Sequence, residues 1–198
     1  MTMISGLKNR LRRVARTVRH LPDRLLHGRR RAAARRMLAN VDVRQAVFIC
    51  HGNINRSAYA AAAFTRSLPA QVRDEVRVSS MGFIGPDRPA SDLAQRVAHG
   101  RGISLGGHRS RLLDGPELKQ TDLIVVMTQD QKNAVMNLLR PRPGRVLILG
   151  DLDPHRIDTR TIQDPYGHPE HVFAQVFDRI DRCTDALVEA IWPHRRDS

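Results

Sequence analysis

Residues 46–57 read Ala46-Val47-Phe48-Ile49-Cys50-His51-Gly52-Asn53-Ile54-Asn55-Arg56-Ser57, and this segment indicates the fold of the domain around it. Its first four residues form a continuous apolar run, which is typical of a strand buried on both faces of a parallel sheet. A glycine-containing loop follows at residues 50–56, and the alanine-rich stretch 57–67 then has the composition of a helix. This order predicts a strand, a loop and a helix, with the loop at the carboxyl end of a buried strand.

The rest of the chain repeats the alternation of strand and helix. Further strands are expected at 76–79, 123–127 and 146–149, and further helices at about 89–101, 129–139 and 169–192. The pattern predicts an α/β fold, a single doubly wound domain with a four-stranded parallel sheet, plus a helical basic N-terminal extension. In such folds ligands bind beyond the carboxyl ends of the strands, near the point where the strand order reverses. A site is therefore expected at the loop after the first strand.

The extension, residues 1–40, differs in composition from the domain expected at 41–198. It holds 12 of the 33 Lys and Arg side chains and a single acid, Asp23, so it carries +11 of the net charge of +13. The spacing of its apolar residues predicts an amphipathic helix, broken at Pro22, with a second helix from about Asp23 to Ala39. The apolar residues are Ile4, Leu7, Leu11, Val14, Val18, Leu21 and Leu25.

Residues 1–36 suit an anionic membrane surface or an acidic partner. The alternative is a helix that packs its apolar stripe on its own domain. Nucleic acid is disfavoured as a partner, because the arm has no aromatic side chains for base stacking. Met37 as the true start codon would remove the arm. The chain has two cysteines and no run of eighteen apolar residues, which favours a cytoplasmic protein, peripheral to the membrane if the arm docks there.

The loop has the pattern C-x5-R-S, and each residue type in it has a chemical use. A thiol at the N-terminal end of a helix, beside an arginine, is stabilised as the thiolate, its nucleophilic form. Successive backbone N–H groups can bind phosphate oxygens, and the Arg56 guanidinium can clamp two more. Gly52 and Asn53 tolerate a left-handed backbone, and the Ser57 hydroxyl can donate to the thiolate. The alternative is a structural cysteine that ends a strand before an ordinary turn.

The sequence resembles the low-molecular-weight protein tyrosine phosphatases, whose signature C-x-G-N-x-x-R-S follows the first strand. Residues 50–57 match this signature at every fixed position. The resemblance extends from about residue 46 to 191, with further matches at 79–82, at 107–111 and at Asp164-Pro165-Tyr166. It implies hydrolysis of a phosphotyrosine-containing protein through a phosphocysteine intermediate, without a metal or another cofactor.

The resemblance also implies a role for each site residue. Cys50 is the nucleophile, Arg56 clamps the phosphate, and Asp164 is the general acid that later activates water. Without the family, Asp-Pro is a plain turn signal, and three nearby carboxylates compete weakly for the acid role: Asp151, Asp153 and Asp158. The expected phosphate-binding loop comprises His51, Gly52, Asn53, Ile54, Asn55 and Ser57. The expected supporting residues are His108, in a buried network with Asn53 and Ser57, and Tyr166, in the pocket wall.

Two positions separate this chain from some relatives of the same fold. Asn55 stands where many family members have a second cysteine that protects the nucleophile in a disulfide. Cys183 is expected to be a buried apolar residue, so such protection is not expected here. Related arsenate reductases need additional redox cysteines, and related arginine phosphatases typically have threonine where this chain has Ile54. A non-catalytic phosphate-binding or docking protein is the alternative from a different class.

Overall fold

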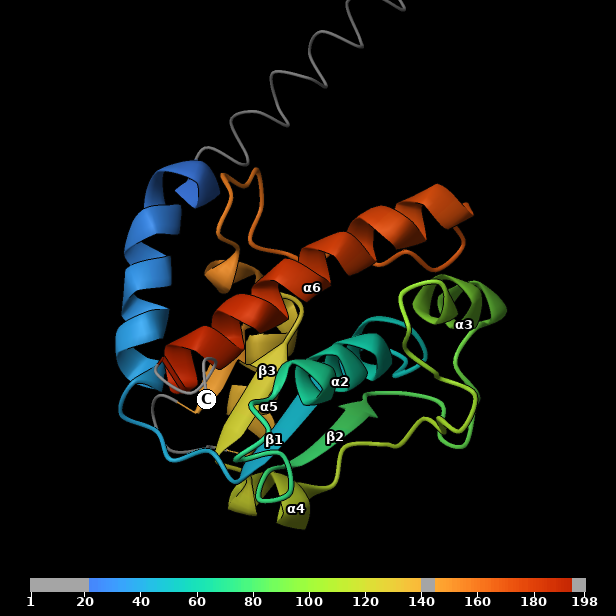
Figure 1. The fold of residues 1–198 in the computed structure, drawn as a ribbon, viewed down its shortest axis with the longest axis horizontal. Coiled ribbons are helices and arrows are strands. Elements are labelled where there is room, and N and C mark those ends of the chain that lie inside the picture. Colours follow the sequence, from blue (N-terminus) through green and yellow to red (C-terminus); the bar gives the residue numbers. More distant parts are fainter. Residues whose placement is uncertain (1–21, 140–144, 194–198) are drawn as a thin grey trace, which may run out of the picture.

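The computed structural model describes residues 22–139 and 145–193 of the 198-residue chain. Its centre is a parallel sheet of β1 (Gln45–Cys50), β2 (Arg77–Gly82), β3 (Leu123–Val126) and β4 (Val146–Ile148), in the order β2-β1-β3-β4 (Figure 1). The chain leaves β1 for β2 on one side and returns to β3 on the other, so the strand order reverses at β1. Cys50, the last residue of β1, therefore lies at the switch point where such folds bind ligands.

Helices cover both faces of this sheet. α2 (Arg56–Ser67), α3 (Asp92–His99) and α6 (Glu170–Ile191) belong to one side, and α4 (Gly115–Gln120) and α5 (Gln129–Leu139) belong to the other (Figure 1). Successive side chains of β1 point to opposite faces of the sheet, so they pack in two separate core layers. Phe48 packs in the core with α2 and α6, while Val47 and Ile49 pack with Leu118 of α4 and Val135 of α5. The predicted doubly wound α/β fold is confirmed.

Each strand and helix expected between residues 41 and 193 is present, with ends shifted by a few residues. Two short elements were not expected, α4 and the 3-10 helix η1 (Leu149–Leu152). Six residues are too few to show a helical period, but α4 has capping signals. Asp114 is its N-cap and accepts a hydrogen bond from the backbone N–H of Glu117 at 3.0 Å, and Pro116 lies in the first turn.

Residues 22–38 form a helix, close to the one predicted from about residue 23 to 39. Ala34 and Leu38 lie in the main core and Met37 packs against it, whereas Leu25 is 71% exposed. The described part of the extension thus packs part of its apolar surface on the domain. The helix predicted before Pro22 lies outside the described residues. Within 22–139 and 145–193, no helix is both long and apolar enough to cross a membrane.

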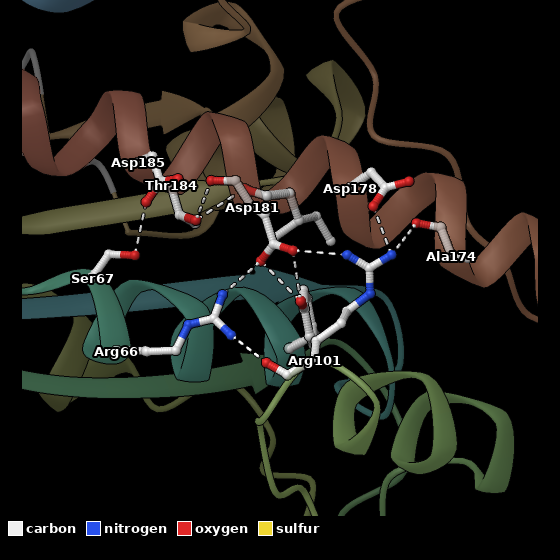
Figure 2. Close-up of polar contacts among 10 residues, drawn as sticks. Arg66, Ser67, Arg101, Ala174, Asp178, Asp181, Thr184 and Asp185 are labelled. Carbon is white, nitrogen blue, oxygen red and sulfur yellow. Dashed lines mark hydrogen bonds and ion pairs between the residues drawn. The ribbon is translucent and has the colours of Figure 1, made fainter.

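A polar cluster joins α2 to α6 (Figure 2). Asp181 of α6 accepts a hydrogen bond from the Tyr59 hydroxyl at 2.8 Å and pairs with Arg101 at 2.9 Å. The Tyr59 ring stacks on Phe177 with 3.7 Å between centroids, and burial, with the nearby carboxylate, raises the pKa of Tyr59. The hydroxyl therefore remains a hydrogen-bond donor. Because α2 begins at Arg56, this cluster fixes the helix that follows the loop at residues 51–55.

Candidate active site

The loop of residues 51–55 turns tightly between β1 and α2. Asn53 has a φ of 52°, in the left-handed region that asparagine tolerates better than most residues. Gly52 does not share this conformation, contrary to the expectation from its residue type; a Cβ there would instead approach a guanidinium nitrogen of Arg88 to 3.1 Å. Gly82, at the end of β2, likewise leaves room for a close contact. A Cβ at Gly82 would lie 2.9 Å from the His51 carbonyl oxygen, so glycine allows the loop to pass close to β2.

The Cys50 thiol is nearly fully buried and receives a hydrogen bond from the Ser57 hydroxyl, with 3.0 Å between oxygen and sulfur. The other acceptor near that hydroxyl, the Met81 carbonyl, is farther away at 3.5 Å. The Ser57 oxygen itself accepts a hydrogen bond from the Asn53 side-chain amide at 2.9 Å. This contact leaves the hydroxyl proton free to point at sulfur, where it stabilises a thiolate.

Asn53 connects the loop to the segment at 107–111. Its backbone carbonyl accepts a hydrogen bond from Nε2 of His108 at 2.6 Å, and its side-chain oxygen accepts the backbone N–H of Arg111 at 2.8 Å. Burial lowers the pKa of His108, the hydrogen bond to Asn53 opposes this, and the Arg109 charge lowers the pKa further. The imidazole is therefore neutral at pH 7, with its proton on Nε2, because a carbonyl can only accept. The structure thus brings together the three residues of the expected network.

Arg56 and Asp164 lie 108 residues apart in the sequence and form an ion pair in the structure. The Arg56 side chain is 4% exposed and that of Asp164 is 44% exposed. Arg56 also donates from Nη1 to the carbonyl of Ile162 at 3.2 Å, so one guanidinium holds both Asp164 and the segment before it. One Asp164 oxygen accepts the backbone N–H of Tyr166 at 3.3 Å, the turn that Asp-Pro signals in the sequence.

A pocket of about 350 Å³ lies over the Cys50 side chain. Its wall consists of Cys50, His51, Gly52, Ile54, Asn55, Ile84, Arg88, Asp164 and Tyr166. Tyr166 is 68% exposed and Ile84 is 45% exposed, so two large apolar side chains stand where the pocket opens to solvent. A buried thiol below exposed apolar side chains fits a substrate whose phosphate enters first and whose aromatic ring stays near the surface.

Arg88 lines this pocket, although the sequence did not single it out. Its guanidinium donates to the carbonyls of Gly52 at 2.9 Å, Gly85 at 2.9 Å and Ile84 at 3.1 Å. Gly85 has a φ of 63°, and a Cβ there would collide with the Arg88 guanidinium. The glycine three residues before Arg88 was a usable turn signal. No motif, however, connects this arginine to a loop 36 residues upstream.

Asn55 is buried and accepts a hydrogen bond from the Ser91 hydroxyl at 2.6 Å. Ser91 is the N-cap of α3, so Asn55 ties the phosphate loop to the start of that helix. Cys183 is fully buried, as expected, and burial raises its pKa to about 12. Neither Cys50 nor Cys183 is in a disulfide. Asn55 therefore performs a structural role at the position where many relatives have a second thiol.

The three carboxylates that competed with Asp164 are engaged elsewhere. Asp153 is buried between two arginines, Asp151 pairs with Arg160, and Asp158 pairs with Arg24. His51, which is expected in the phosphate-binding loop, is exposed and lines the pocket. Among the residues that the structure describes, no group of three or more His, Cys, Asp or Glu side chains could hold a metal ion.

Comparison with known proteins places the chain in a family. The sequence profile described as "Low molecular weight phosphotyrosine protein phosphatase" matches residues 45–196. EpsP of Ralstonia nicotianae, which carries the name of these phosphatases, is 32% identical over 151 residues, or 75% of this chain and 97% of EpsP. The human low molecular weight phosphotyrosine protein phosphatase is 26% identical over 158 residues, or 77% of this chain and 98% of the human protein.

Two solved structures show the same architecture. The tyrosine phosphatase Wzb from Escherichia coli K30, in complex with sulphate, has a TM-score of 0.66 at 25% identity, covering 75% of this chain and 98% of Wzb. The YwlE arginine phosphatase from Geobacillus stearothermophilus has a TM-score of 0.65 at 26% identity, covering 75% of this chain and 93% of YwlE. Since the profile match spans most of the chain, this protein belongs to the low molecular weight phosphotyrosine protein phosphatase family.

Proposed function

We propose that this phosphatase hydrolyses phosphotyrosine in proteins by a two-step reaction with Cys50 as the nucleophile. The observation that carries the proposal is that Cys50 and Asp164 line one pocket, where Ser57 donates to the thiol and Arg56 pairs with the carboxylate. In the first step Sγ of Cys50 attacks phosphorus, and the tyrosyl oxygen leaves with the proton of the Asp164 carboxyl group. In the second step the Asp164 carboxylate takes a proton from water, whose oxygen attacks phosphorus and releases phosphate and the thiolate.

Arg56 is proposed to stabilise the charge on the phosphoryl group. Its side chain is buried and is already fixed by the Ile162 carbonyl, so it needs little reorganisation when the phosphoryl oxygens gain charge. Its Nε is buried and has no hydrogen-bond partner among the described residues. A bound phosphate would satisfy this donor, because a buried N–H group rarely stays unpaired. Backbone N–H groups of residues 51–57 complete the proposed phosphate site.

The side chains around the pocket support an aromatic leaving group. Tyr166 and Ile84 stand at the opening, and Ile54 adds an apolar surface beside the loop. The likeness to YwlE makes phosphoarginine the competing substrate. Ile54 weighs against it, because related arginine phosphatases typically have threonine there.

A substrate comparison tests the proposal. The kcat/KM of the purified protein is expected to be much higher for a phosphotyrosyl peptide than for the matching phosphoarginyl peptide. Cys50→Ser is expected to abolish turnover while inorganic phosphate still binds in calorimetry. Equal or higher activity on phosphoarginine would reassign the substrate, and substantial turnover by Cys50→Ser would exclude Cys50 as the nucleophile.

We propose a separate role for the basic extension, taking residues 1–40 as the extension and 41–198 as the phosphatase domain. Its strong positive charge supports contact with an anionic membrane surface at the cytoplasmic side, with an acidic protein partner as the alternative. Removal of residues 1–21 leaves the packed helix at 22–38 in place. The truncated protein is expected to sediment less with phosphatidylserine-containing vesicles than the full chain. Equal sedimentation would remove the membrane proposal.

A further inference from the structure

The helix at residues 22–38 begins beside the segment that leads to Asp164. Figure 1 shows its first turns next to the loop that follows η1. Asp23 accepts a hydrogen bond from the backbone N–H of Arg160, with 3.1 Å between oxygen and nitrogen. The other carboxylate oxygen of Asp23 pairs with Arg30 at 2.5 Å, and its side chain is 21% exposed. A side chain of the extension thus binds the main chain four residues before the proposed general acid.

The same helix makes a second contact with this loop. Nε2 of His27 lies 2.9 Å from the backbone carbonyl of Asp153, and His27 is 9% exposed. The Asp153 side chain is buried against Arg179 and Arg182 at 2.9 and 2.8 Å. Its pKa lies below its usual value, because hydrogen bonds from Arg182 and the His155 N–H outweigh the opposing effect of burial. The helix therefore contacts the loop at both 153 and 160.

Residues 160–162 are held one after another. The Arg160 guanidinium pairs with Asp151 and donates to Gln129 at 2.7 Å. The Thr161 carbonyl accepts a hydrogen bond from Arg179 at 2.8 Å.

Ile162 continues this series. Its N–H donates to the Met127 carbonyl at 2.9 Å, and its own carbonyl accepts from Arg56. These partners of residues 160–162 all belong to the stretch 45–196 that the family profile matches, whereas Asp23 comes from outside it. The extension thus supplies one of the hydrogen bonds that hold the main chain just before Asp164.

We infer that Asp23 is a positioning residue for the general acid, and that the N-terminal helix is a working part of this active site. The inference rests on the proposed role of Asp164. A carboxylate that binds the Arg160 N–H limits the movement of residues 160–164 and keeps the Asp164 carboxyl group within reach of the leaving oxygen. Loss of this contact should weaken protonation of the leaving group and leave the phosphate loop unaffected.

Asp23→Ala tests the inference with two substrates that differ in their leaving group. The kcat/KM for phenyl phosphate, which reports the step in which the leaving group departs and needs the acid, is expected to fall by about fivefold, the effect of one hydrogen bond. The kcat/KM for p-nitrophenyl phosphate, whose leaving group needs little protonation, is expected to change by less than about twofold. Asp23→Asn should restore most of the loss, because its amide oxygen can still accept the Arg160 N–H.

Arg24→Ala is the matched control, since it lies on the same helix and contacts the same loop through an exposed ion pair with Asp158. It is expected to leave the ratio of the two rates unchanged. Equal loss on both substrates in Asp23→Ala, or the same change of ratio in Arg24→Ala, would overturn the inference. Asp23→Glu shifts the acceptor by one methylene and is a milder variant if the alanine variant does not fold; its ratio should move in the same direction.

Two further readouts separate the inference from the proposed function. Hydrogen exchange of the peptide covering 159–164 should be faster in Asp23→Ala, with unchanged protection in β1 and α2; unchanged exchange at 159–164 would overturn the inference. Asp164→Ala in the same assay should show the strongest dependence on the leaving group. If it shows none, the acid assignment fails; if Asp164→Ala shows it and Asp23→Ala does not, only the role of Asp23 fails.

Discussion

The loop at residues 50–57, which we propose binds phosphate, and the segment 159–164, which carries the proposed general acid, meet at one pocket but are held in different ways. The loop lies between two consecutive elements, β1 and α2, and much of its hydrogen bonding joins Cys50, Asn53 and Ser57 within eight residues. The segment 159–164 depends on side chains that are distant in sequence, among them Asp23 and Arg179. If the proposed roles hold, phosphate capture is a local property of this fold, whereas leaving-group protonation depends on the tertiary structure.

The largest effect is expected from substitution of Arg56, which ends the loop and contacts the segment that carries Asp164. Arg56 begins α2, contacts Asp164 and holds the Ile162 carbonyl. Arg56→Lys retains the charge but loses the planar fork, so kcat/KM should fall by about a thousandfold for good and poor leaving groups alike. Steady-state kinetics on phenyl and p-nitrophenyl phosphate measure this. A loss smaller than tenfold would mean that loop N–H groups alone provide the stabilisation.

Asp164→Ala should impair the function of the segment 159–164 and leave the loop at 50–57 intact. The kcat/KM for phenyl phosphate, which is not affected by the later hydrolysis of the phosphocysteine, is expected to fall by about a hundredfold or more, because the leaving oxygen must depart without a proton. The kcat/KM for p-nitrophenyl phosphate should fall much less, and phosphate affinity should stay within about threefold of the wild type, as the loop is untouched. Kinetics combined with calorimetric phosphate binding test this. Equal losses on the two esters would count against an acid role.

The same contrast explains what could be predicted from the sequence. The buried strand, the loop and the residues at 50–57 follow from one contiguous pattern. Asp164 could be assigned only through the family resemblance, because a lone Asp-Pro indicates a turn. Contacts of Arg88 with Gly52 and of Asp23 with Arg160 span 36 and 137 residues, and no periodicity or motif specifies such pairings.

The type of a single residue was also an incomplete guide to its backbone conformation and its contacts. Gly52 and Asn53 were both expected to tolerate a left-handed backbone; Asn53 adopts it, whereas Gly52 does not and instead leaves room for Arg88. The sequence shows that position 55 lacks the second cysteine found in many relatives. It does not predict the hydrogen bond between Asn55 and Ser91, because that bond depends on where α3 packs. Helix α4 had its N-cap signal in Asp114 but was too short for an apolar period.

A smaller effect is expected from Asn53→Ala, which disturbs the local region alone. The substitution removes the side-chain bonds to Ser57 and Arg111 and places alanine at a positive φ. The free energy of unfolding should fall by about 1–3 kcal/mol. The kcat should fall by about tenfold on both phenyl and p-nitrophenyl phosphate, because Ser57 is no longer oriented toward sulfur. Urea denaturation and kinetics measure the two effects; a selective loss on phenyl phosphate would show that the loop and the acid segment are not independent.

The smallest effect concerns pH and the supporting histidine of the loop. Burial keeps the pKa of His108 below its usual value, so the folded state favours the neutral ring. Stability from this group is therefore complete above about pH 6.5, the pKa expected in the unfolded chain, and is lost as the pH falls toward the folded-state value. His108→Gln retains an amide N–H that can donate to the Asn53 carbonyl but cannot titrate. Between pH 7.5 and 5, the free energy of unfolding should therefore fall less in this variant than in the wild type, as measured by urea denaturation. Parallel pH profiles for the two proteins would mean that protonation of His108 does not contribute to acid destabilisation of the loop.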